Sequence, residues 1–132
     1  MRVVIFRGSG GRELLADALR SRGASVQYVD VYRRRLPATA MAALDRLIGG
    51  PPVDIIVATS NEGLMNLFEC AGERHRDWLL ARQLVVMSER TAALAVTLGF
   101  EKAACVASEA SDQGLLDAIA RAASIIRAGT TA

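Results

Sequence analysis

The sequence predicts an α/β fold: a parallel five-stranded sheet packed between helices, as in flavodoxin-like or Rossmann-like sandwiches. Short, nearly continuous apolar runs, typical of strands buried on both faces, alternate along the chain with segments of helical period. Strands that alternate with helices form parallel sheets with right-handed crossovers. A chain of 132 residues with 52% hydrophobic content is long and apolar enough for one such core.

The beginning of the chain reads as a compact β-α-β unit. Residues 3–6 are the expected first strand, and a glycine-rich turn runs from Arg7 to Arg12. The apolar periodicity predicts a helix over residues 11–22, and Gly23 follows where a left-handed helix cap is wanted. The second strand is predicted over residues 25–31.

The rest of the chain repeats this alternation. Strands are predicted over residues 54–58, 84–87 and 103–107. Helices are predicted over residues 39–48, from the turn at 59–63 onward, as a short turn near 78–81, and over residues 88–99 and 113–126. Thr59 and Glu62 have capping-box spacing at one helix start, and the polar turn 108–112 is expected to cap the last helix.

The two parts meet at the stretch VDVYRRRLP, residues 29–37. An apolar run ends at Tyr32, and three arginines and a proline follow, so the chain leaves a packed layer here. We therefore expect a half-lobe over residues 1–32, a crossover linker over 33–53 and a second half-lobe over 54–132. The chain forms a single domain if the linker folds back.

Composition narrows the function classes. A formal charge of +2 and 5% aromatic residues suit an anionic small molecule better than nucleic acid, which usually meets a denser basic face and stacking aromatics. The apolar runs are too short to span a membrane, and no secretory signal is visible at MRVVIFRG. We expect a cytoplasmic protein.

The cysteines and the histidine show no ligand spacing. Cys70 and Cys105 lie far apart and belong to no CxxC pattern, so they are expected to be reduced structural thiols. His75, the single histidine, lies in GERHRDW and is predicted to be a surface loop residue. Neither residue type indicates a metal site by its spacing.

Three nucleotide or phosphate readings of the first turn fit poorly. A phosphorelay receiver needs metal-binding carboxylates where Arg7 and Gly8 stand. A dinucleotide site begins well with Gly8 and Gly10, and Asp30 falls near the ribose-binding position, but Glu13 replaces the third glycine. A flavodoxin phosphate loop is richer in serine and threonine than this arginine-flanked turn.

Polar residues follow each predicted strand. In open parallel sheets, ligands bind beyond the carboxyl ends of the strands, and helix N-termini there offer backbone N–H groups to carboxylates or phosphates. The polar segments at this edge are residues 7–12, 32–35, 59–63, 88–91 and 108–112.

Four stretches in order resemble the second half of uroporphyrinogen-III synthase. They are VVIFRGSGGRELLADALRSRGASVQYVDVYRRRLP, DIIVATSNEGLMNLFE, WLLARQLVVMSERTAALAVTLGF and VASEASDQGLLDAI. The resemblance implies two α/β lobes joined by a two-stranded ladder, with the active site between them. It also implies a reaction without cofactors, in which hydroxymethylbilane, a linear polycarboxylate tetrapyrrole, loses water and closes with inversion of its last pyrrole ring.

The resemblance also implies roles for particular residues. Tyr32 matches the family's cleft tyrosine and would assist departure of the substrate hydroxyl; otherwise it is a half-buried strand-end tyrosine. The substrate carboxylates would be held by Arg7, Arg12, Ser60, Asn61, Gly63, Ser88, Arg90 and Thr91. Each of these has a plain alternative, either as a helix cap or as a solvated surface charge.

The chain has only about half the family's length. Two copies that exchange halves as a homodimer would restore a two-lobed protein, and a separate or upstream first half would do the same. The alternative function is a non-catalytic module that binds a tetrapyrrole or another polyanion, or a fragment of a longer synthase.

Overall fold

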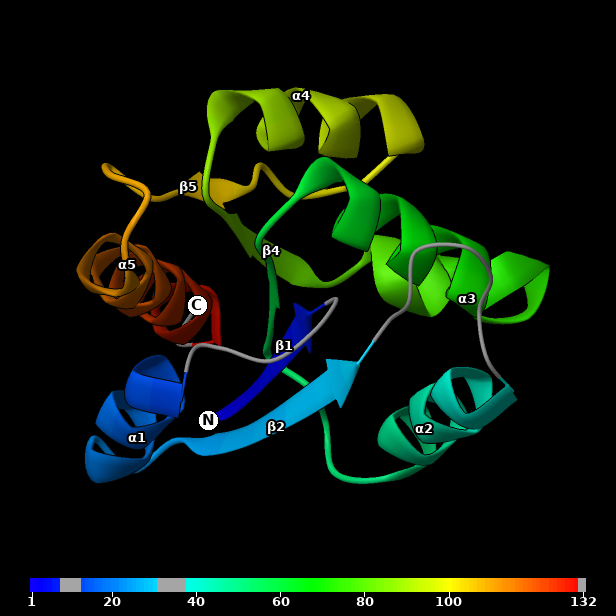
Figure 1. The fold of residues 1–132 in the computed structure, drawn as a ribbon, viewed down its shortest axis with the longest axis horizontal. Coiled ribbons are helices and arrows are strands. Elements are labelled where there is room, and N and C mark those ends of the chain that lie inside the picture. Colours follow the sequence, from blue (N-terminus) through cyan, green and yellow to red (C-terminus); the bar gives the residue numbers. More distant parts are fainter. Residues whose placement is uncertain (8–12, 31–37, 131–132) are drawn as a thin grey trace.

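A computed structural model describes residues 1–7, 13–30 and 38–130. In this part of the chain, a five-stranded sheet with the order β2-β1-β3-β4-β5 has every neighbouring pair parallel (Figure 1). The predicted α/β class with a parallel five-stranded sheet is confirmed. The order is the flavodoxin-like one of the two alternatives considered.

The elements lie within a few residues of their predicted positions. The strands are β1 Arg2–Arg7, β2 Ser25–Asp30, β3 Ile55–Ala58, β4 Gln83–Val86 and β5 Cys105–Val106. The helices are α1 Glu13–Ser21, α2 Ala38–Gly49, α3 Asn61–Leu80, α4 Glu89–Leu98 and α5 Asp112–Thr130. Gly99 ends α4 in the left-handed conformation, with φ 101°.

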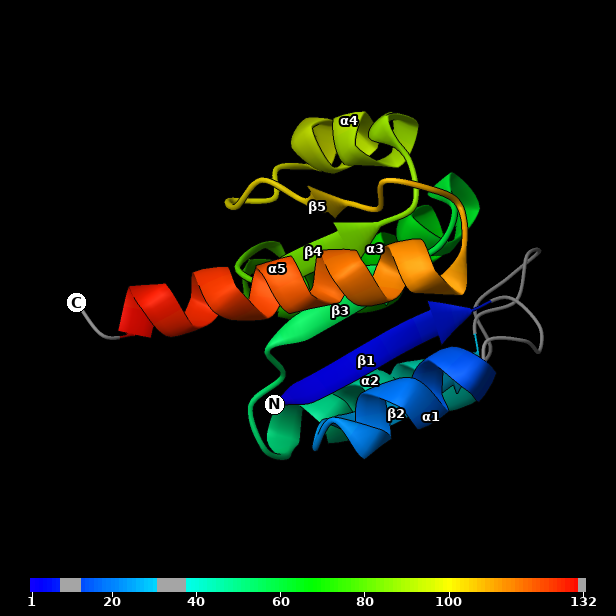
Figure 2. The same ribbon diagram turned by 90° about the vertical axis from the view of Figure 1, so that its left-hand side faces the viewer.

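The sheet forms the middle of three layers. Helices α1 and α5 cover one face, and α2, α3 and α4 cover the other (Figure 2). Side chains of β1 alternate between the two cores: Val3 and Ile5 pack toward α1 and α5, whereas Val4 packs toward α2 and α3. β3 and β4 are buried at every position, which explains why they read as continuous apolar runs.

β1 is the second strand of the sheet, next to the central strand β3. It pairs with β2 on one side and with β3 on the other, where Val3 lies opposite Ile55 and Phe6 opposite Ala58. The first β-α-β unit therefore joins the same sheet as the strands that follow α2. The carboxyl ends of the strands consequently lie along one edge of the sheet.

One local prediction is too short, and another is wrong. The turn expected near residues 78–81 belongs to α3, which continues past a kink at Gly72, where φ is 57° and ψ −164°. His75 consequently lies in this helix rather than in a loop, and its Nε2 lies 2.6 Å from Asp45 Oδ1 on α2. The histidine fastens α3 to α2.

Both cysteines are free and buried, one in each core. Burial raises the pKa of the Cys70 thiol above its usual 9.0, and the nearby Asp45 carboxylate adds to this. Burial also raises the pKa of Cys105, although Arg121 opposes the shift. Both residues fit the predicted role of reduced structural thiols.

We expect neither thiol to react with 5,5′-dithiobis(2-nitrobenzoate) in the native protein at pH 8, and both to react in concentrated urea. The raised pKa values also predict a loss of stability in alkali. The neutral thiols contribute fully to the free energy of unfolding below the pKa of the unfolded chain. This contribution is lost as the pH rises through the higher pKa values of the native protein. Stoichiometric labelling of the folded protein would contradict this description of the cores.

Candidate functional site

Two helices at the carboxyl edge of the sheet begin with the same serine cap. Ser60 follows β3, and its Oγ accepts a hydrogen bond of 3.0 Å from the Gly63 N–H. Ser88 follows β4, and its Oγ accepts one of 3.3 Å from the Thr91 N–H. The predicted capping box of Thr59 with Glu62 is wrong by one residue, because Ser60 holds the cap position.

A third helix starts in the same way after β5. The Ser111 Oγ accepts a hydrogen bond of 3.0 Å from the Gly114 N–H, which confirms that the polar turn caps α5. Gly114 is required for space, since a Cβ there would collide with the Glu109 backbone carbonyl. Three neighbouring strands therefore lead into serine-capped helix N-termini at one edge of the sheet.

Thr91 joins the first two of these loops. Its side-chain hydroxyl donates a hydrogen bond of 2.6 Å to Asn61 Oδ1, on the first turn of α3. Its Oγ1 also lies 3.2 Å from Ser88 Oγ. Because Thr91 is only 3% exposed, these bonds are shielded from water and stronger than surface hydrogen bonds. The result is that the N-termini of α3 and α4 are held together as one unit.

The residues of this unit differ in their exposure to solvent. Ser60, Ser88 and Arg90 are exposed, whereas Asn61 and Gly63 are half-buried. Each helix N-terminus carries a partial positive charge and directs backbone N–H groups outward. The arrangement suits anionic groups with several carboxylates, provided that these can reach both loops.

The remaining predicted site residues lie at or beyond the limits of the described chain. Arg7 is the last residue of β1 and lies in register with Asp30, so its backbone stands at the same edge. Tyr32 and Arg12 lie outside the described residues. The edge described here therefore contains Arg7 by position and the six residues of the two joined loops.

Sequence reasoning missed how Thr91 works. It placed Thr91 among the substrate-binding residues but did not foresee that its hydroxyl donates to Asn61, thirty positions away in sequence. Nothing in the local sequence SERT, residues 88–91, distinguishes a bridging threonine from an ordinary residue of the first helical turn. Only the neighbouring positions of β3 and β4 in the sheet bring the two side chains together.

No metal centre is visible in residues 1–7, 13–30 and 38–130, where no three His, Cys, Asp or Glu side chains gather in a metal-binding group. Among the same residues, no helix is long and apolar enough to cross a membrane. The described edge offers hydrogen bonding from the capped helix starts and charge from the exposed Arg90 guanidinium.

The fold and this edge define a class: a parallel α/β domain with serine-capped helix N-termini along the carboxyl edge of its sheet. Residues 1–117 match the family model described as uroporphyrinogen-III synthase HemD, and the chain belongs to this family. It is 38% identical over 119 residues to the uroporphyrinogen-III synthase of Escherichia coli (strain K12), and equally identical over the same length to that of Salmonella typhimurium (strain LT2).

The chain spans about half the length of these relatives. Each alignment covers 89% of this chain but 48% of the relative. The resemblance noted from the sequence is thus confirmed at the level of the family, together with its half-length character.

The joined loops make a stability prediction. Thr91→Val keeps the shape of the side chain but leaves Asn61 Oδ1 without its donor, so the free energy of unfolding should fall by about 1–2 kcal/mol. Thr91→Ser should recover most of it. Urea unfolding followed by circular dichroism measures both.

Thr97→Val is the matched control, because its hydroxyl bonds only to the Ala93 carbonyl on an exposed face of the same helix. Its effect should stay within about 0.5 kcal/mol. Equal losses for the two valine variants would mean that the Thr91–Asn61 bond does not fasten the edge.

Proposed function

We propose that this chain carries the uroporphyrinogen-III synthase reaction: cyclisation of hydroxymethylbilane with loss of water and inversion of the last pyrrole ring. Membership of the family over residues 1–117 is the observation that carries the proposal. The edge of capped helix N-termini supports it, since the substrate is a flexible tetrapyrrole with acidic side chains on every ring.

In this proposal the joined loops hold substrate carboxylates. Ser60 and Ser88 offer exposed hydroxyls beside backbone N–H groups, and Arg90 adds an exposed guanidinium. Asn61 and Gly63 shape the first loop, and Thr91 acts by fixing that loop to the second. Arg7 and Arg12 are proposed to bind further carboxylates from the turn after β1.

The chemical step needs little from the protein beyond position. The C–O bond of the hydroxymethyl group breaks, and the hydroxyl takes up one proton and leaves as water. Loss of the N–H proton from the same pyrrole ring gives the neutral azafulvene. Tyr32 is proposed as the group that donates a hydrogen bond or proton to the departing oxygen. The protein then holds the linear tetrapyrrole so that the substituted carbon of the last ring attacks the azafulvene. This attack makes a spiro intermediate, which leads to inversion of the ring.

A second candidate function follows from the length of the chain. Since the chain covers 48% of its relatives, it would lack a complete second lobe if it acted alone. A module with only one carboxylate-binding edge would hold a tetrapyrrole or another polyanion without directing its closure. This binding module is the alternative to the synthase.

Exchange of halves between two copies would supply the second lobe. We propose that residues 1–32 of one copy pair with residues 54–132 of the other, across the linker 33–53. Every strand pairing of the sheet is preserved in such an exchange, with β1 of one copy lying against β3 of its partner. A separate first-half protein is the other way to complete the pair of lobes.

The product isomer distinguishes the two functions. With hydroxymethylbilane as substrate, the synthase proposal predicts uroporphyrinogen III, resolved from the I isomer by chromatography after oxidation. Only the I isomer, formed at the rate of the reaction without protein, would leave a binding module.

Tyr32→Phe should slow formation of the III isomer by at least about tenfold, because it removes the proton donor. Tyr28→Phe, which lies in β2, is the matched control and should leave the rate nearly unchanged. An unchanged rate in Tyr32→Phe would remove Tyr32 from the mechanism.

Half exchange predicts a dimer. Size-exclusion chromatography with light scattering at micromolar concentration should give twice the 14.1 kDa mass of one chain. A strictly monomeric species would rule out exchange. Activity of that monomer would then show that one lobe suffices.

A further inference from the structure

A groove lies at the opposite end of the molecule from the capped helices. It runs between α1 and α5 beside the start of β1, and its volume is about 370 Å³. Figure 2 shows α1 and α5 on the same side of the sheet, with the beginning of β1 between them. None of the described residues assigned above to the tetrapyrrole lines this groove.

The floor of the groove is apolar. Val3 of β1, Leu19 of α1 and Leu116 and Ile119 of α5 line it, and none of these side chains is more than 8% exposed. Apolar groups continue up the walls through Met1 and Ala120. A volume in the range of small-molecule sites, with such a floor, favours a ligand that has an apolar body.

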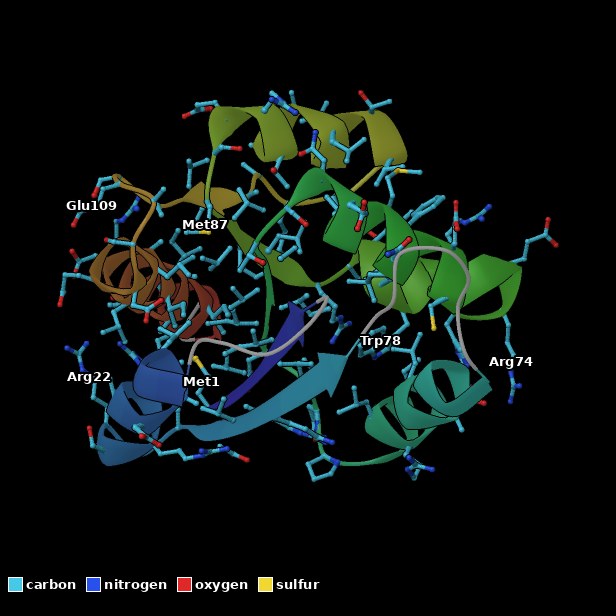
Figure 3. All side chains as sticks on the ribbon, in the orientation of Figure 1. Met1, Arg22, Arg74, Trp78, Met87 and Glu109 are labelled. Carbon is cyan, nitrogen blue, oxygen red and sulfur yellow. The ribbon has the colours of Figure 1, made fainter. Side chains whose placement is uncertain are left out.

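The rim is cationic. Arg22 follows the end of α1 and Arg127 lies in the last turn of α5, and both are exposed. Among the residues that the structure describes, no acidic one lines the groove. Figure 3 shows Arg22 at the outer side of α1, on the same side of the molecule as α5. The two arginines also counter the partial negative charge of the helix C-termini here, so that this end of the molecule can accept an anion.

A neighbouring hollow at the same end lacks this combination. It contains Arg2 and Asp54, but Arg2 donates side-chain hydrogen bonds to Pro51 O and Gln27 Oε1, and the Asp54 carboxylate accepts from the Arg2 N–H. Its charged groups are therefore used within the protein. The groove between α1 and α5 is the better ligand site of the two because it combines a buried apolar floor with exposed arginines.

We propose that the groove between α1 and α5 binds a single-chain anionic amphiphile, with its carboxylate beside Arg22 and Arg127 and its hydrocarbon chain on the floor of Val3, Leu116 and Ile119. A neutral apolar ligand would leave the rim unused, and a purely polar anion would leave the floor unused. The site is separate from the proposed tetrapyrrole edge and stands whether or not the chain is a synthase.

Decanoate below its micellar concentration is the probe, measured by isothermal titration calorimetry on the full chain. It should bind at one site per chain. Acetate, which has the head without the chain, and decyltrimethylammonium, which has the opposite charge, should bind at least about tenfold more weakly. Equal binding of the cation would overturn the proposed rim.

Three variants locate the site. Arg22→Gln should weaken decanoate binding by about fivefold, and Arg46→Gln, which removes the same charge from α2 on the far face, should leave it unchanged. Ala120→Trp places a large ring in the mouth of the groove at an exposed position and should abolish binding, with its fold checked by circular dichroism. No binding to the wild-type chain, or undiminished binding to Ala120→Trp, would refute the proposal.

Discussion

The parallel pairing of β1 with β3 is the constraint on which the rest of the structure depends. It brings the first β-α-β unit into the sheet formed by the later strands, and it places Phe6 and Ala58 side by side at the carboxyl edge. The same pairing lets α5 return over α1 and close the second core. Without it, a two-stranded unit with one helix would have too little apolar surface to fold by itself.

The pairing of β1 with β3 aligns the carboxyl ends of the strands along one edge of the sheet. β3 and β4 are buried at every position, so the loops that leave them supply the exposed hydroxyls and helix N-termini. The bond from Thr91 to Asn61 converts two such loops into one rigid unit. A long, flexible polyanion is better directed by fixed donors than by mobile ones, because less ordering remains to be done on binding.

Much of the fold could be predicted from the sequence, for identifiable reasons. The apolar runs of β3 and β4 and the terminating Gly99 are local signals, and both predictions hold. The position of His75 could not be obtained this way, since α3 resumes after the kink at Gly72 and Asp45 meets the histidine from another helix.

The candidate site was predictable in its position but not in its internal contacts. Polar residues after strands indicate the binding edge of any parallel sheet, and the family resemblance selected among them. The bridging role of Thr91 depends on a partner thirty residues away, which no spacing rule reveals. The role of Tyr32 rests on the family resemblance alone, because this residue lies outside the described chain.

The central claim is that the capped helix starts after β3 and β4 hold the carboxylates of a tetrapyrrole. Amide chemical shifts of ¹⁵N-labelled protein, followed while uroporphyrin III is added, test it most directly. The account predicts shifts concentrated at residues 60–63 and 88–91, and weaker ones in Thr91→Val. Shifts confined to the groove between α1 and α5, or none at all, would contradict it.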